Sequence, residues 1–174
     1  RYGVDHSDAR FLVGEGQEEV DNALAIRDRC PKLQRIIWDD PKGMRGYDDP
    51  GLLSLAALSE MGRELGERQP GLFEKLVEQG HGDDVCLLFY TSGTTAQPKG
   101  ALLTHWNMLK MGEHMMAVDP CGEDEDFVSF LPFAWIGEQM MSISCGLQAG
   151  FTINFPEEPE TVQQNIREIG PQVL

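Results

Sequence analysis

The sequence predicts an α/β fold in which a mostly parallel sheet is flanked by helices. Short apolar runs alternate with amphipathic segments, the order expected when parallel strands are joined by crossover helices. Polar breaks rich in glycine, proline and aspartate, at residues 41–51 and 80–84, separate these segments. Hydrophobic residues make up 41% of the 174 residues and charged residues 25%, a composition typical of a globular protein.

The elements can be assigned in chain order from their hydrophobic periodicity. The expected strands span residues 11–14, 35–38, 85–91, 127–131 and 152–155. The expected helices span residues 18–29, 52–65, a shorter segment around 72–77, and 159–169. Pro159 can open the last helix, and Gly170-Pro171 stops it.

The charge balance excludes several classes of partner. The formal net charge is −15, from 29 acidic and 14 basic residues, whereas nucleic-acid phosphates and anionic lipids are bound by clustered Lys and Arg. The least charged stretch, residues 131–155, carries Glu138 alone and is interrupted by proline, glutamine and glycine. It therefore predicts a buried helix and strand, and no membrane span is expected.

Cysteine and histidine usage predicts a cytoplasmic protein without a metal site. The four cysteines form no CxxC pair and the four histidines are scattered, so reduced and mostly buried thiols are expected. The polar opening segment does not resemble a signal peptide. Because the chain starts at Arg1 and stops abruptly at Leu174, we expect both ends to be truncated.

A segment rich in hydroxyls follows the most apolar strand. Residues 91–100 read TSGTTAQPKG, with four hydroxyls, two glycines and a lysine. A triphosphate requires such a set, because glycine permits close backbone approach, hydroxyls donate hydrogen bonds and lysine supplies a mobile cation. The GxxxxGK[ST] phosphate loop is excluded, since Pro98 takes the place of its second glycine and Gly100 follows Lys99. The alternative is a polar turn between two strands.

The string YTSGTTAQPKG resembles the signature of the adenylate-forming superfamily, which includes acyl-CoA synthetases, luciferases and peptide-synthetase adenylation domains. The next residues, ALLTHWN, resemble its continuation, a short strand ending in LTHxN. Thr104 is the expected N-cap of a helix running toward Val118. Ala96 departs from the family's usual glycine and should restrict the loop. The resemblance is most specific from about Asp84 to the end of the chain.

A second segment, FLPFAWIGE at residues 130–138, resembles the LPxAHxxE segment of long-chain acyl-CoA synthetases. In that family it lies beside the substrate pocket, which implies an acyl-pocket role for Trp135 and Glu138. Trp135 stands where His is common in the family, and its alternative role is a core aromatic. The apolar side chains Met140, Met141, Ile143 and Leu147 predict a buried helix face, although thioethers would also suit an alkyl chain.

The resemblance implies two half-reactions. A fatty acid attacks the α-phosphorus of ATP to give an acyl-adenylate and pyrophosphate, and coenzyme A then takes the acyl group, with Mg²⁺ near the phosphates. The residues implied in phosphate binding are Thr91, Ser92, Gly93, Thr94, Thr95 and Lys99. No catalytic residue is assigned, because the adenine contacts, the Mg²⁺-binding acid and the lysine of the small C-terminal domain are expected beyond Leu174.

Residues 1–174 are accordingly expected to be part of the large N-terminal domain of an adenylate-forming enzyme, and to be inactive alone. Two alternatives remain: an enzyme that adenylates an aryl or other acid for a carrier-protein thiol, and a degenerate nucleotide-binding module without catalysis. Ala96 and Trp135 suggest the second. A fatty substrate makes peripheral membrane contact reasonable, but the chain has no basic amphipathic helix to support it.

Overall fold

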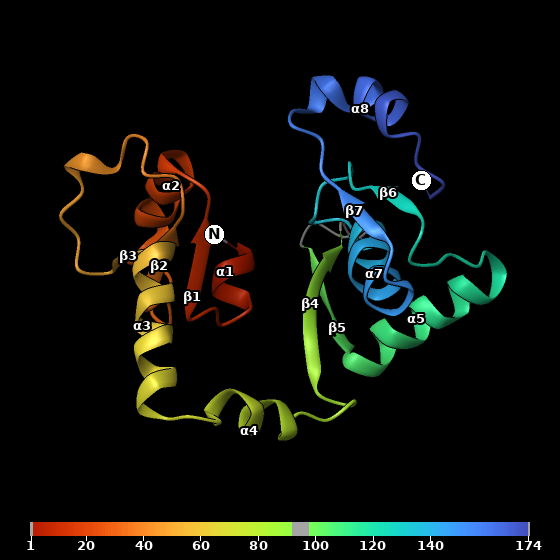
Figure 1. Cartoon of the computed structure of the whole chain (residues 1–174). Helices are drawn as coiled ribbons and strands as arrows, with labels where there is room; N and C mark the ends of the chain where they lie inside the picture. The colour runs from red at the N-terminus through yellow and green to blue at the C-terminus, as the bar shows by residue number, and fades with distance from the viewer. Residues whose placement is uncertain (1, 92–97, 174) are drawn as a thin grey trace. The chain divides into compact units, whose positions relative to one another are not determined.

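A computed structural model of the chain describes residues 2–91 and 98–173. Two compact units make up the chain, Arg1–Gly80 and His81–Leu174 (Figure 1). The predicted α/β class is confirmed, since parallel strands occur in both units together with helices. Within the described ranges no helix is both long and apolar enough to cross a bilayer.

The first unit is built on a three-stranded parallel sheet in the order β1-β2-β3. Its elements are α1 (Tyr2–His6), β1 (Phe11–Gly14), α2 (Gln17–Arg27), β2 (Arg35–Trp38), η1 (Met44–Gly46), β3 (Leu52–Ser54), α3 (Leu55–Arg68) and α4 (Leu72–Glu78). Val20 and Ala23 of α2 pack with Ile36 of β2 to form the core. Crossover helix α2 therefore buries its apolar face against the sheet, as the sequence predicts.

The expected helix at residues 52–65 is wrong at its beginning. Leu52 and Leu53 pair with Ile36 and Ile37 as strand β3, and the helix starts only at Leu55. Pairing with β2 makes Leu52 and Leu53 a strand. A local cap then sets the start of the helix, because the Ser54 hydroxyl accepts a hydrogen bond from the Ala57 N–H at 3.1 Å and satisfies a donor that the first helical turn leaves unpaired.

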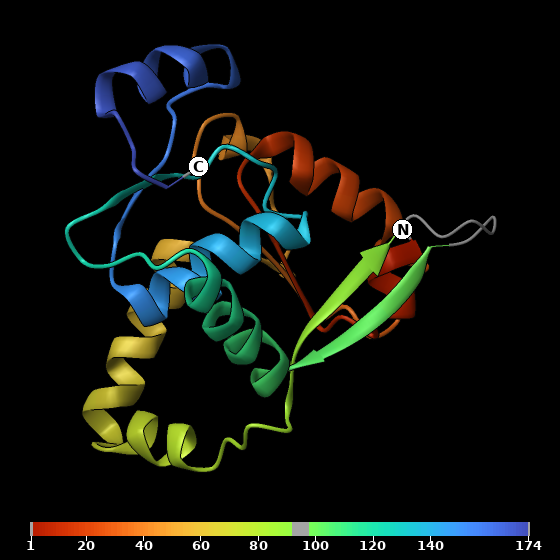
Figure 2. The ribbon, with the colours of Figure 1, turned by 90° about the vertical axis from the view of Figure 1, so that its right-hand side faces the viewer.

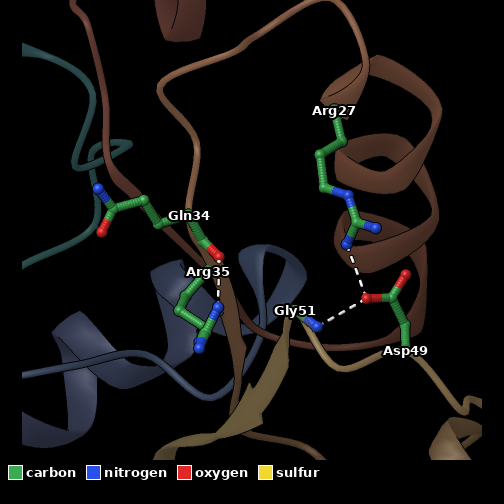
Figure 3. A network of polar contacts seen from close by, with 5 residues as sticks. All are labelled: Arg27, Gln34, Arg35, Asp49 and Gly51. Atoms are coloured by element: carbon green, nitrogen blue, oxygen red, sulfur yellow. Dashed lines mark hydrogen bonds and ion pairs between the residues drawn. The ribbon is translucent and has the colours of Figure 1, made fainter.

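One carboxylate ties the loop before β3 to helix α2 (Figure 3). The Arg27 guanidinium and the Gly51 N–H both donate to Asp49 Oδ1 at 2.7 Å. Chiefly because of the bond from Arg27, and then that from Gly51, the pKa of Asp49 lies below its ordinary value. Tyr47 hydrogen-bonds to Asp21 in the same helix, so the predicted surface loop is anchored to α2 at two points.

The second unit combines a hairpin, a parallel strand pair and several helices. Its elements are β4 (Val85–Thr91), β5 (Lys99–Thr104), α5 (His105–Val118), β6 (Asp126–Val128), α6 (Ile136–Gln139), η2 (Met140–Cys145), α7 (Gly146–Ala149), β7 (Thr152–Asn154), η3 (Pro159–Thr161) and α8 (Val162–Ile169). β4 and β5 are antiparallel, and β6 and β7 are parallel. Phe127, Cys145 and Phe151 form the core.

Three expectations in this unit need correction. β6 ends at Val128, so residues 129–131 lie outside the strand. The expected helix at 159–169 begins as a short 3₁₀ turn and becomes α-helical at Val162. The expected buried stripe is only partly right: Met140 and Met141 are half-buried, and Met141 packs against the core. Ile143 and Leu147 are exposed, whereas Ser142, Ser144 and Cys145 are buried. These buried residues lie in η2, a π-helical turn.

The reversed burial follows from close packing of α5 against η2, which lie side by side in Figure 2. A Cβ atom at Gly112 of α5 would lie only 2.8 Å from the carbonyl oxygen of Ser144. Gln148 Nε2 bridges the two helices by donating to the carbonyl oxygens of Leu109, at 2.8 Å, and Ser144, at 3.0 Å. Such an approach leaves room only for small side chains between the helices.

We therefore predict that Gly112→Ala destabilises the second unit by about 1–3 kcal/mol, because the added methyl group must push α5 away from Ser144. Gly62→Ala is the matched control, since Gly62 also lies inside a helix and its Cβ would meet nothing within 4 Å. Urea titration of both variants measures the difference. Equal stabilities would contradict the close approach.

We also predict a pH-dependent role for Asp49. Its lowered pKa means that the stability it contributes is present above the ordinary carboxyl value of 3.8 and is lost as pH falls through the folded-state value. Asp49→Asn should therefore lower the free energy of unfolding at pH 6 and make little difference well below the ordinary carboxyl range. Asp48→Asn, at an exposed neighbour, controls for loss of charge. A pH-independent effect of Asp49→Asn would contradict the prediction.

Candidate functional site

The β4–β5 hairpin brings the two ends of the hydroxyl-rich segment together. Thr91 pairs with Lys99 and Tyr90 with Gly100 across the antiparallel ladder. Among the implied phosphate-binding residues, Thr91 and Lys99 are thus placed opposite each other, and both are exposed. The others, Ser92, Gly93, Thr94 and Thr95, together with Ala96, lie outside the described residues.

Gly100, next to Lys99, lies close to side chains of β4. A Cβ atom at this position would lie 2.7 Å from Leu88 Cδ1 and 3.5 Å from Tyr90 Cε1. Because Gly100 lacks a side chain, the Leu88 side chain can lie across β5. The glycine of the motif thus serves the strand pairing itself, in addition to any approach of a ligand.

The opposite end of the hairpin is fixed by a capping box at Thr104, the N-cap that the sequence predicts. The Thr104 hydroxyl accepts from the Asn107 N–H at 3.2 Å, and Asn107 Oδ1 accepts from the Thr104 N–H at 2.9 Å. The resulting helix, His105–Val118, begins and ends where the sequence predicts. The His105 and Trp106 N–H groups also donate to carbonyl oxygens of Asp84 and Gly82, so the start of β4 and the end of β5 are joined.

The two sequence motifs line one open cleft of about 540 Å³. One wall comes from the end of β4 and the other from the loop and first turn of α6; the lining residues are Phe89, Tyr90, Thr91, Ala134, Trp135, Ile136 and Gly137. The Trp135 side chain is 59% exposed, which excludes the alternative of a core aromatic within this unit. The cleft therefore joins an apolar wall to the strand that leads into the hydroxyl-rich segment.

Glu138 does not line this cleft but is 1% exposed behind it. Its carboxyl group accepts hydrogen bonds from the Ser129 hydroxyl at 2.6 Å, from the Leu131 N–H at 3.2 Å, and from the Ser142 hydroxyl. The neighbouring Gln139 donates from Nε2 to the Phe133 carbonyl oxygen at 2.9 Å. This role could not be predicted from the sequence, because a single carboxylate in an apolar stretch has no partner that spacing alone identifies.

A second open cleft, of about 570 Å³, was not anticipated from the sequence. An adjacent part of the same loop and the segment after β7 line it, with Ser129, Phe130, Leu131, Phe133, Phe155, Pro156, Pro159, Val162 and Gln163. Its aromatic residues are the available signal, but the expected strand at residues 127–131 does not indicate a cleft. The loop 129–135 thus contributes walls to two apolar clefts.

Metal ligation and thiol chemistry find no support in the described part of the chain. It contains no group of three or more His, Cys, Asp or Glu side chains able to hold a metal ion. The four cysteines are free, with Cys30 and Cys145 buried, Cys121 half-buried and Cys86 exposed. Burial raises the pKa of Cys121 and of Cys145, which keeps both protonated and poorly nucleophilic at neutral pH.

Comparison with known proteins identifies relatives across the whole chain. The sequence profile described as "AMP-binding enzyme" matches residues 1–174. The long-chain-fatty-acid–CoA ligase ACSBG2 of Xenopus laevis is 27% identical over 180 residues, covering 98% of this chain and 23% of the relative. ACSBG1 of Bos taurus, another long-chain-fatty-acid–CoA ligase, is 27% identical over 172 residues, covering 94% and 23%. The chain therefore spans about a quarter of the length of these relatives.

Solved structures support the fold. The anthranilate CoA ligase AuaEII in complex with anthranoyl-AMP matches with a TM-score of 0.69 and 19% identity, over 98% of this chain and 31% of that one. ATP-bound MatB from Rhodopseudomonas palustris matches with a TM-score of 0.64 and 20% identity, over 97% and 30%. At this identity the likeness concerns the fold alone.

Because the capping box closes the base of the hairpin, we predict that Thr104→Ala destabilises the second unit by about 1 kcal/mol. Thr104→Ser keeps the accepting hydroxyl and should retain most of the stability. Thermal unfolding of the two variants beside the parent sequence measures the difference. If serine proves as costly as alanine, the hydroxyl contributes nothing and the capping account is wrong.

Proposed function

Because the chain belongs to the AMP-binding enzyme family, we propose that the whole protein uses ATP to activate a fatty acid. The acid carboxylate attacks the α-phosphorus, forming an acyl-adenylate and releasing pyrophosphate, and the thiol of coenzyme A then takes the acyl group. The names of the matched relatives, long-chain-fatty-acid–CoA ligases, support this substrate and this acceptor. These relatives are 27% identical to the chain, so the fatty acid and coenzyme A are proposed here as substrate and acceptor.

The observation that carries the proposal is the cleft lined by both motifs. The end of β4 supplies Tyr90 and Thr91, and the 130–138 segment supplies Trp135 on the facing wall. Joining an acid to ATP requires a polar subsite for phosphates beside an apolar subsite for the acyl chain. Holding both reactants in one cleft makes the attack effectively intramolecular.

We assign phosphate binding to the hairpin tip, which we define as the end of the ladder where Thr91 pairs with Lys99 together with the hydroxyl-rich segment between them. Lys99 contributes a cation and Thr91 lies opposite it, so a charge that develops on the pyrophosphate leaving group would meet a positive partner. Ser92, Thr94 and Thr95 are proposed to donate hydroxyl hydrogen bonds, and Gly93 to allow close backbone approach. Mg²⁺ would neutralise the phosphates further, but the described residues offer it no ligand cluster, and its ligands are sought elsewhere in the whole protein.

We assign the acyl chain to the apolar side of the same cleft. The exposed indole of Trp135, with Phe89 and Ile136 nearby, offers an apolar wall to an alkyl chain. Tryptophan cannot act as an acid or base as histidine would at this position, so the role proposed for Trp135 is shape and not proton transfer.

We further propose that residues 1–174 form part of the large N-terminal domain. The chain spans 23% of the length of the first matched relatives, and the adenine contacts, the Mg²⁺-binding acid and the lysine of the small C-terminal domain would come from other parts of the whole protein. The 174-residue chain alone is accordingly proposed to be inactive.

The test is acid-dependent ATP–pyrophosphate exchange by the whole protein with short, long and aromatic acids. Long-chain acids should support exchange, and Lys99→Ala should reduce it about a hundredfold, because a charged contact to the leaving group is lost. Lys110→Ala is the matched control, since Lys110 is an exposed cation of the same unit that pairs with Glu113. It should change the rate less than twofold.

Three other results of the exchange assay would change the proposal. Unchanged exchange in Lys99→Ala would contradict the role of the hairpin tip. Exchange with aromatic acids alone would replace the fatty acid by an aryl substrate. A folded protein that binds ATP but supports no exchange with any acid would indicate a degenerate nucleotide-binding module.

A further inference from the structure

Glu138 is a buried carboxyl group whose three hydrogen-bond donors come from two different segments. Ser129 follows β6, Leu131 lies in the loop, and Ser142 belongs to the π-helical turn η2. With 1% of its surface exposed, Glu138 has lost nearly all hydration. Within the described ranges it forms no ion pair, so these three donors replace the lost water.

Two of the three donors bound by Glu138, Ser129 and Leu131, lie on the loop that forms the cleft walls, and the third, Ser142, lies in η2. Ser129 and Leu131 line the second cleft, and the loop continues through Ala134 and Trp135 into the first cleft. Two further bonds hold the same loop: Gln139 Nε2 donates to the Phe133 carbonyl oxygen, and the Trp135 N–H donates to the Pro132 carbonyl oxygen at 2.8 Å. Glu138 and Gln139 of α6 thus hold the loop at residues 129, 131 and 133, and the bond from Trp135 to Pro132 closes a turn within the loop.

We propose that Glu138 is a positioning residue that sets the shape of the acyl subsite by locking loop 129–135 against α6 and η2. The role in shaping an acyl subsite rests on the proposed function. That Glu138 holds the loop in place does not depend on it. Glu138 touches neither cleft, so it acts through the loop and does not contact the substrate.

An apolar residue of similar size could fill the same space but would not lock the loop. Glu138→Leu would leave the Ser129 and Ser142 hydroxyls and the Leu131 N–H without their acceptor in a buried site, which is unfavourable. The loop would then relax away from α6, moving Trp135. The β4–β5 hairpin, held by its own ladder and capping box, would keep its geometry.

The consequence is a selective defect in acid recognition. In the whole protein, Glu138→Leu should raise KM for the long-chain acid and weaken the preference among chain lengths by about tenfold, which corresponds to about 1.4 kcal/mol of lost recognition. KM for ATP should change less than about twofold, because the hairpin is untouched. Glu138→Gln should recover part of the preference, since its amide can still accept from the Leu131 N–H and donate to the two serine hydroxyl oxygens.

The locking is measured without activity by hydrogen–deuterium exchange of peptides covering residues 129–137 in the whole protein. Glu138→Leu should speed exchange there by about tenfold or more, because the Leu131 N–H loses its acceptor. Peptides covering the hairpin should exchange as before. Glu113→Gln is the matched control, an acid of the same unit that is exposed and pairs with Lys110, and it should leave exchange in both regions unchanged.

The outcomes separate the two proposals. Faster exchange in 129–137 in a protein that activates no acid would retain the locking and overturn the proposed function. Unchanged exchange and unchanged acid preference in Glu138→Leu would overturn the positioning role, as would equal losses for acid and ATP. If Glu138→Leu does not fold, the double variant S129A/S142A decides by the same measurements, because it removes two of the three donors and keeps the carboxyl group.

Discussion

The antiparallel pairing of β4 with β5 is the interaction on which the candidate site depends. Its register places Thr91 opposite Lys99 at one end, while the capping box of Thr104 and Asn107 closes the other. A hydroxyl and a cation meet at the tip only because the ladder is in this register, since a slip by one residue would turn every side chain to the opposite face. Gly100 permits the register by leaving room for Leu88.

The facing wall is held by a different kind of interaction. There the loop carries exposed aromatic side chains, and buried polar groups fix it from behind, through Glu138 and Gln139. A loop without regular structure can present Trp135 to solvent in one orientation only if its backbone groups find partners elsewhere. The sequence thus separates two tasks at one short helix: Trp135, which precedes α6, forms the surface, and Glu138 and Gln139 within α6 hold the loop.

Local signals with a physical mechanism predicted the structure well. The strands 11–14, 35–38 and 85–91 and the start of α5 at the Thr104 cap agree with the structure, because apolar runs and caps act through neighbours in sequence. Features that depend on contacts between residues far apart in the sequence were harder to predict. β3 was missed because Leu52 and Leu53 fit a helical stripe as well as a strand, and pairing with β2 decided between them. The burial of Ser144 in place of Ile143 depends on Gly112, which is far away in the sequence.

The most direct test of the account is a structure of the whole protein bound to ATP together with an unreactive long-chain acid analogue. We expect the β- and γ-phosphates to bind at the hairpin tip, with the Lys99 ammonium within hydrogen-bonding distance of a phosphate oxygen. We also expect the alkyl chain to pack against Trp135 in the cleft that the two motifs line. Phosphates bound away from Lys99, or an alkyl chain bound outside this cleft, would contradict it.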